Sequence, residues 1–220
     1  MRPLVLLNPN TSEATTAAML ELARQEAGSA VRVEGFTAAF GASLICDPPA
    51  LAVAADAVLA LIPRIIELDP TGVVIAAFGD PGLQQLSARL DCPVVGIAQA
   101  GMAEAAGGDR RFSVVTTTPD LAASIMGMAD RYGWGQHCLG VRLTPGEPRV
   151  LMAEPNALRH ALLLACEQAV QLDGAQAIVI GGGPLAAAAR AIAHRVAVPL
   201  VEPVPAAIRL VLRLSVATND

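Results

Sequence analysis

The chain contains one structural unit twice, and this repeat is the strongest limit on its possible folds. The first copy runs from the apolar stretch Val73–Phe78 through a glycine-proline turn and a helical stretch to a strand that follows Pro93. The second copy begins at Ala177, about 105 residues further on, and its last strand follows Pro199. Because each copy reads as strand, turn, helix and strand, we expect two similar lobes built around parallel sheets.

Strand-like and helix-like stretches also alternate along the rest of the chain. The predicted strands are Leu4–Leu7, Val31–Gly35, Val73–Phe78, Val94–Ile97, Phe112–Thr116, Leu139–Leu143, Ala177–Gly181 and Leu200–Glu202. The predicted helices include Ser12–Gly28, Pro49–Leu68, Pro119–Tyr132 and Pro155–Leu172. The predicted fold class is therefore α/β, with two similar α/β/α lobes that each hold a parallel four-stranded sheet and are related by a pseudo-twofold axis. A ligand cleft would lie between the lobes, at the carboxyl ends of the two sheets.

The repeat also suggests where one lobe ends and the other begins. We assign residues 1–98 to the first lobe and residues 99–205 to the second. The last predicted helix, Ala206–Leu214, is assigned with the C-terminal residues, about 206–220, to the first lobe. The sequence pattern leaves open whether this helix does return to the first lobe.

The composition excludes several classes of protein. Apolar residues make up 54% of the 220 residues and charged residues 16%, which excludes a disordered chain. No apolar run reaches the roughly 18–20 residues of a membrane span, so no membrane partner is expected. All 15 basic residues are arginine, and a chain without lysine has neither the lysine of a phosphate-binding loop nor one for a Schiff base. The net charge of -5 and the scattered arginines argue against a nucleic-acid partner.

The termini and the cysteines suggest where the protein works. The apolar start at Leu4–Leu7 is too short for the core of a signal peptide. The four cysteines are widely spaced and form no C-x-x-C motif. We therefore expect a cytoplasmic protein with reduced thiols and no metal site. The high apolar content further predicts self-association into a homo-oligomer.

Polar side chains follow two strands that hold equivalent positions in the two halves. Asn8, Asn10 and Thr11 come after the first strand, and Thr116 and Thr117 come at the end of the first strand of the second half. Such residues cap helices, but the group after the first strand is larger than a cap requires. We expect these side chains, with the N–H groups of the helix starts, to bind a carboxylate or a carbonyl oxygen.

A glycine-rich turn follows the first strand of each repeat copy, at 79–82 and at 181–184. Glycines at such turns let the backbone approach a ligand closely. The second turn, with Gly181, Gly183 and Ala186, also fits the dinucleotide-binding pattern, and Glu202 lies at about the right distance beyond it. However, a proline interrupts this turn and a single strand follows it, so nucleotide binding is the weaker interpretation.

Together these motifs resemble the aspartate/glutamate/hydantoin racemase superfamily, with the hydantoin and allantoin racemases as the nearest members. The resemblance covers essentially the whole chain and rests on Asn8–Ser12, Phe78–Leu83, Thr116–Thr118 and Gly181–Leu185. It implies two α/β lobes that hold a substrate with an acidic C–H beside a carbonyl, without a cofactor. One cysteine from each lobe would act on this carbon, one thiolate removing the proton and the other thiol returning it from the opposite face. The substrate-binding residues that the motifs imply are Asn8, Asn10, Thr11, Phe78, Gly79, Thr116, Thr117, Gly182 and Gly183.

The sequence departs from this pattern at both cysteine positions, where it has Ala77 and Gly182. Losing one positioned acid or base typically lowers the rate by about 10²–10⁴-fold, so the two-thiol mechanism is not expected here. The candidate replacements are Asp80, in the first glycine turn, and Cys46, in the loop after the second strand. The competing interpretations are a helix cap for Asp80 and a buried small apolar residue for Cys46.

The leading functional prediction is a racemase or isomerase that transfers a proton next to a carbonyl of a small acid or a cyclic ureide, without a cofactor. A cofactor-free lyase or decarboxylase in the same cleft is one alternative. A non-catalytic protein that binds a small molecule is the other. All three interpretations predict a small-molecule ligand between the lobes.

Overall fold

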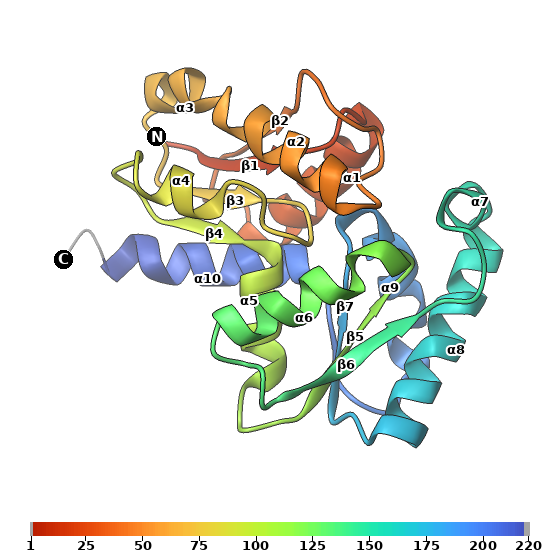
Figure 1. Cartoon of the computed structure of the whole chain (residues 1–220). Helices are drawn as coiled ribbons and strands as arrows, with labels where there is room; N and C mark the ends of the chain where they lie inside the picture. Colours follow the sequence, from red (N-terminus) through yellow and green to blue (C-terminus); the bar gives the residue numbers. More distant parts are fainter. Residues whose placement is uncertain (1, 218–220) are drawn as a thin grey trace.

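The computed structural model describes residues 2–217 and contains two parallel four-stranded sheets (Figure 1). The first sheet has the order β2-β1-β3-β4 and the second has the equivalent order β6-β5-β7-β8. The strands of the first sheet are β1 (Leu4–Asn8), β2 (Val33–Thr37), β3 (Gly72–Ile75) and β4 (Val94–Gly96). Those of the second are β5 (Phe112–Thr116), β6 (Cys138–Leu143), β7 (Ala177–Ile180) and β8 (Leu200–Val201). The predicted fold class, two similar α/β lobes with parallel sheets, is confirmed.

Helices connect the strands and cover both sheets (Figure 1). In the first lobe they are α1 (Glu13–Ala27), α2 (Pro48–Leu59), α3 (Ile62–Leu68) and α4 (Leu83–Ser87), and α5 (Ile97–Ala106) leads into the second. The later helices are α6 (Ala122–Arg131), α7 (Pro148–Ala153), α8 (Pro155–Asp173), α9 (Ala186–Ile192) and α10 (Pro203–Ala217). Short 3-10 turns lie at Pro119–Leu121, Gly183–Leu185 and Ala193–Arg195.

One predicted helix, Pro49–Leu68, is in fact two helices, α2 and α3. The break falls just before Pro63, which occupies the first turn of α3. A proline ring at this position would clash with the carbonyl of Leu59, four residues earlier, if the helix continued through it. The prediction of one continuous helix was therefore wrong.

The strand predicted at Val73–Phe78 is also shorter than expected, because β3 ends at Ile75. The last residue of β3, Ile75, pairs with Gly96, which is also the last residue of β4. Beyond Ile75, β4 therefore has no residue left to pair with β3. Ala76 still donates its N–H to the Leu7 carbonyl of β1, and the following residues Ala77 and Phe78 line the space next to the turn after β7. This early end of β3 supplies one wall of the pocket described below.

The two lobes share a single apolar cluster. Leu6 and Val74 of the first sheet belong to the same buried cluster as Val114 and Val179 of the second. The central strands β1, β3, β5 and β7 are buried along their whole length, as the apolar runs of parallel strands require. The lobes are therefore held together by a common core rather than by a flexible linker.

The contacts of the C-terminal helix α10 bear on the question that the sequence left open. It packs against α1, β3, β4 and α5, and in Figure 1 it lies along the underside of the first lobe. Its Val211 fits against Gly72, where an added Cβ would come within 2.5 Å of the Val211 side chain. The C-terminal helix therefore packs on the first sheet and on α5, while the assignment of the lobes stays a prediction.

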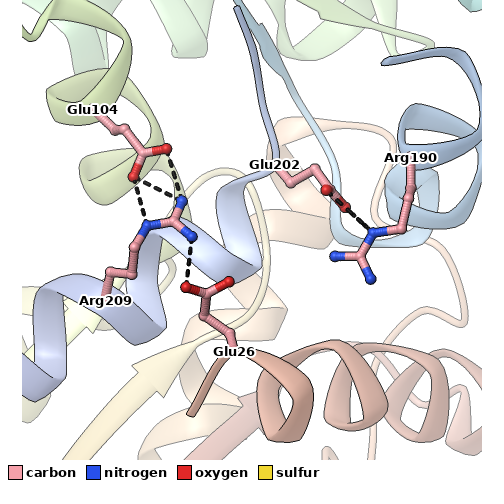
Figure 2. A network of polar contacts seen from close by, with 5 residues as sticks. All are labelled: Glu26, Glu104, Arg190, Glu202 and Arg209. Carbon is pink, nitrogen blue, oxygen red and sulfur yellow. Dashed lines mark hydrogen bonds and ion pairs between the residues drawn. The ribbon is translucent and has the colours of Figure 1, made fainter. Parts of the chain in front are cut away.

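Polar contacts reinforce this junction (Figure 2). Arg209 of α10 lies between Glu26 of α1 and Glu104 of α5, at 2.7 Å from an oxygen of each. Arg190 of α9 contacts Glu202, just after β8, at 3.2 Å. A second nitrogen of the same arginine donates a hydrogen bond of 2.9 Å to the α1 side chain Gln25. The contacts of Arg209 with Glu104 and of Arg190 with Gln25 join helices of different lobes.

Among residues 2–217, no helix combines the length and the apolar character that crossing a bilayer requires.

Candidate active site

A pocket of about 50 Å³ lies between the lobes, at the carboxyl ends of the central strands. The first lobe contributes Asn10, Leu44, Ile45, Leu51, Ala76, Ala77 and Phe78. The second lobe contributes Thr117, Thr118, Leu121, Met152 and the run Gly181–Leu185. The pocket thus lies where the sequence predicted the ligand cleft.

The first polar loop is held together by Asn8, which is completely buried. Its side-chain nitrogen donates to Asn10 Oδ1 at 2.8 Å and to Thr16 Oγ1 at 2.9 Å. The same Asn10 oxygen accepts a second hydrogen bond from the N–H of Ser12, at 2.9 Å. Asn8 therefore holds the loop in shape without lining the pocket, whereas Asn10 lines it.

These hydrogen bonds also determine which side-chain atom of Asn10 is left to bind a ligand. Both bonds described above are accepted by its oxygen, and none among residues 2–217 is donated by its amide nitrogen. Asn10 is 5% exposed and its free N–H₂ group is therefore available to donate a hydrogen bond to a molecule in the pocket. Thr11 is not part of the lining; its N–H bonds to the carbonyl of Ala42.

The threonine run of the second lobe has a similar division of roles. The buried Thr116 hydroxyl donates to the carbonyl of Gly181 at 2.8 Å. Because a hydroxyl has one proton, the 3.1 Å bond between Thr116 and Thr118 must be donated by Thr118. Thr116 thus fixes the backbone of the glycine turn, whereas Thr117 and Thr118 line the pocket.

The glycine turn brings the second lobe into direct contact with the first. An added Cβ at Gly183 would lie 2.4 Å from the sulfur of Met19 in α1 and 3.2 Å from the carbonyl oxygen of Ala76. Gly182 is different, since its backbone is extended and an added Cβ would meet only the Leu185 side chain, at 3.3 Å. Position 183 therefore favours glycine strongly, whereas position 182 can take a small side chain if the Leu185 side chain shifts slightly.

The two positions that the family resemblance assigns to cysteines both reach this pocket. Ala77 lines it from the first lobe and Gly182 lines it from the second. Within the described part of the chain, the lining includes no ionisable side chain at all. Asparagine and threonine side chains and backbone groups supply its whole polar surface.

Asp80 does not line this pocket. Its buried carboxylate accepts hydrogen bonds from the N–H groups of Ala98 and Gln99, at 2.9 and 2.8 Å, and from the Tyr132 hydroxyl, at 2.8 Å. It thereby caps the start of α5, and Gly96 leaves the space that its carboxylate occupies. Burial raises the pKa of Asp80 to about 6, although all three hydrogen bonds act in the opposite direction. This geometry favours a helix cap over the predicted proton carrier.

Cys46 lies closer to the pocket. It directly follows Ile45, a lining residue, and its side chain is half-buried. Burial raises the pKa of the Cys46 thiol, while Arg149 of the second lobe acts to lower it. Of the other cysteines, Cys138 and Cys166 are buried in the second lobe. Cys46 is thus the thiol next in sequence to a lining residue, while it is not itself part of the lining.

The structure divides the predicted substrate-binding residues into two groups. Those that line the pocket are Asn10, Phe78, Thr117, Gly182 and Gly183. Those that do not are Asn8, Thr11, Gly79 and Thr116. The apolar lining residues that sequence reasoning missed include Leu44, Ile45, Leu51, Leu121 and Met152. Nothing in the sequence separates these side chains from ordinary core residues, because each is a single apolar residue in a loop or helix.

The site offers no place for a metal ion within the described residues, where no three His, Cys, Asp or Glu side chains gather as ligands would. The glycine turn that fits the dinucleotide pattern is followed by a 3-10 turn and the short helix α9. Glu202, which that pattern would assign to a ribose, contacts Arg190 instead. The absence of a cofactor stays a prediction.

The first prediction concerns the contact between the lobes. Gly183→Ala should lower the free energy of unfolding by about 1–3 kcal/mol, because the new methyl group overlaps Met19 and presses on the Ala76 carbonyl. The matched control, Gly182→Ala, should lower it by less than about 1 kcal/mol, because only the Leu185 side chain has to shift. Urea unfolding of the two variants measures the difference, and equal losses would contradict the steric assignment.

The second prediction concerns Asp80. Its folded-state pKa of about 6 lies above the ordinary value of 3.8, so the folded chain binds this proton more tightly than the unfolded chain. The titration of Asp80 therefore contributes stability that is complete below about pH 4 and is lost as the pH rises through about 6. The difference in unfolding free energy between wild type and Asp80→Asn should fall accordingly from pH 4 to pH 7.

Urea unfolding at each pH tests this, with Asp56→Asn on the exposed side of α2 as the control for removing one carboxylate. A difference between wild type and Asp80→Asn that grows with pH would mean that the hydrogen bonds outweigh burial.

Comparison with known proteins agrees with this architecture. Residues 4–211 match the sequence model of the Asp/Glu/Hydantoin racemase family. A hydantoin racemase from Rhizobium meliloti is 33% identical over 212 residues, which cover 93% of this chain and 85% of that protein.

Two solved structures are similar over almost the whole chain. The allantoin racemase from Klebsiella pneumoniae superimposes with a TM-score of 0.92 at 32% identity, covering 100% of this chain and 89% of that one. The allantoin racemase from Pseudomonas fluorescens gives 0.90 at 29% identity, covering 98% and 92%. The chain therefore belongs to the Asp/Glu/hydantoin racemase family, and the enzyme class that this family assigns to it is that of a racemase, an isomerase.

Proposed function

We propose that this protein binds a small compound with an acidic C–H beside a carbonyl, in the pocket between the lobes, and catalyses proton transfer at that carbon. The observation that carries the proposal is the pocket itself, in which hydrogen-bond donors of both lobes converge on an otherwise apolar space. The membership of the racemase family supports the same reaction class. No metal or organic cofactor takes part in the proposed reaction.

A neutral cyclic ureide fits this pocket better than a free amino acid or a dicarboxylate. The lining within residues 2–217 holds no arginine or histidine, so a carboxylate would be buried there without a cationic partner. The ring carbonyls of a ureide need only hydrogen-bond donors, which Asn10 Nδ2 and the Thr117 hydroxyl supply. The relatives named above as hydantoin and allantoin racemases bear the names of cyclic ureides.

The donors would also assist the reaction. When the proton leaves the carbon, negative charge moves onto the adjacent carbonyl oxygen. Donors that already point at this oxygen stabilise the charge without reorganising, and the apolar surroundings strengthen their effect. Asn10 and Thr117 are the side chains that we assign to this role.

The proton carrier has to be a group other than a thiol at position 77 or 182. We assign it to Cys46, because it is half-buried and directly follows the lining residue Ile45. Its thiolate would take the proton from the carbon, and a water molecule would return a proton from the opposite face. Since burial raises the pKa of this thiol, the rate should increase with pH. Asp80 is less suited, because its carboxylate already accepts three hydrogen bonds.

A non-catalytic binding protein is the second candidate function, and a specific observation favours it. The lining of the pocket in the described part of the chain has hydrogen-bond donors and no ionisable group. Such a pocket can bind a ureide without changing it.

The cytoplasmic location and the homo-oligomeric state also stay predictions.

The third prediction tests the reaction. Loss of the α-proton signal of hydantoins, allantoin, amino acids and arylmalonates is followed by NMR in heavy water. We expect wild-type protein to exchange the proton of a hydantoin, and Cys46→Ser to be slower by about 10²-fold or more, since it lacks the proton carrier. Asp80→Asn should exchange at a similar rate wherever it is folded.

The double variant Ala77→Cys/Gly182→Cys is the positive control, because both positions line the pocket and position 182 can take a small side chain if Leu185 shifts slightly. It should exchange faster than wild type. Binding without exchange by wild type would establish the binding protein instead, and release of carbon dioxide would establish a lyase. Neither binding nor exchange with any compound would refute the proposal.

A further inference from the structure

Some apolar side chains of the pocket come from segments that connect the strands and helices, away from the strand ends that carry its polar residues. Asn10 and Thr117 lie directly beyond the strands β1 and β5. Leu44 and Ile45 come from the loop between β2 and α2, and Met152 comes from α7. The polar groups of the pocket therefore lie at the strand ends, and Leu44, Ile45 and Met152 add apolar side chains from connecting segments.

Helix α7 is positioned so that one of its residues reaches the pocket. Glu147 caps its first turn by accepting a 2.8 Å hydrogen bond from the N–H of Val150. Leu151 is buried and packs on Gly146, where an added Cβ would lie 3.3 Å from the leucine side chain. Successive residues of a helix point in directions about 100° apart. Anchoring Leu151 therefore turns Met152 to another side, which lines the pocket.

Apart from this anchor, α7 packs against α8 (Figure 1). In Figure 1 it stands at the outer edge of the second lobe, beside the beginning of α8. Met152 itself is half-buried, as are Leu44 and Ile45 from the other lobe. These three residues are thus among the partly exposed lining residues, as are Leu51 and Ala77.

We propose that Met152 sets which substituent the substrate can carry on the carbon that bears the acidic proton, and that this substituent is apolar. The inference rests on the proposed function, because it places the ureide ring against Asn10 and Thr117. The substituent then points toward Leu44, Ile45 and Met152, which offer no charge and no hydrogen bond. Methionine is unbranched and flexible, so its side chain can adapt to substituents of different size.

The pocket size makes this residue decisive. With a cavity of about 50 Å³, a large substituent fits only if a wall gives way. The sheet-side lining is held by hydrogen bonds, since Thr116 binds the Gly181 carbonyl and Asn8 binds Asn10. Met152 lies on a short helix outside both sheets, and its unbranched side chain can adopt other conformations more readily than this hydrogen-bonded part of the lining.

The fourth prediction tests this assignment by isothermal titration calorimetry with 5-methylhydantoin and 5-benzylhydantoin. Met152→Ala should bind the benzyl compound more tightly and the methyl compound more weakly than wild type does. The ratio of the two dissociation constants should change by about tenfold, as expected for methylene-sized changes in an apolar pocket. Val150→Ala, on the same helix but 62% exposed and outside the lining, is the matched control and should leave the ratio unchanged.

A second variant keeps the test independent of any effect of Met152→Ala on folding. Met152→Phe should shift the ratio in the opposite direction, by excluding the benzyl compound and retaining the methyl compound. Equal effects on both ligands in both variants would overturn the role of Met152. If wild type and variants bind neither hydantoin, the proposed function is wrong and not merely the assignment of its specificity.

Discussion

The close approach of the two lobes at Gly183 is the contact on which the pocket depends. The turn after β7 can touch α1 and the end of β3 because this residue has no side chain. Were the lobes further apart, Asn10 and Ala77 on one side would not face Thr117 and Gly182 on the other. The shared apolar cluster and the contacts of Arg209 with Glu26 and Glu104 hold the lobes in this arrangement from the far side (Figure 2).

Buried hydrogen bonds then make the walls of the pocket rigid. Asn8 has no contact with the pocket, yet it determines which atom of Asn10 is left for a ligand. Thr116 does the same for the glycine turn through the Gly181 carbonyl. Leaving either of these buried groups without its partner would be unfavourable, so the polar side of the pocket has one stable geometry.

Charge is kept out of the pocket throughout the described part of the chain. The ion pairs there involve none of its lining residues, and Asp80 is directed to the start of α5. An uncharged, mostly apolar pocket strengthens each hydrogen bond to a developing oxyanion but supplies no base of its own. This is why the proposed chemistry depends on a residue outside the lining, Cys46, and why a purely binding role is its main competitor.

The sequence by itself determined the α/β class, the two similar lobes, and the presence of alanine and glycine at positions 77 and 182. These features depend on periodicity and on residue types close together in the chain, which act locally. It also indicated Asn10 and Thr117, since polar residues after parallel strands gather at one edge. The tertiary structure alone decided that Asp80 caps α5 and that Met152 reaches the pocket. It also decided that Asn8 and Thr116 hold the lining loops in place without lining the pocket themselves. The direction of these side chains is set by partners far away in the sequence, and no local pattern records which partner lies within hydrogen-bond or packing distance.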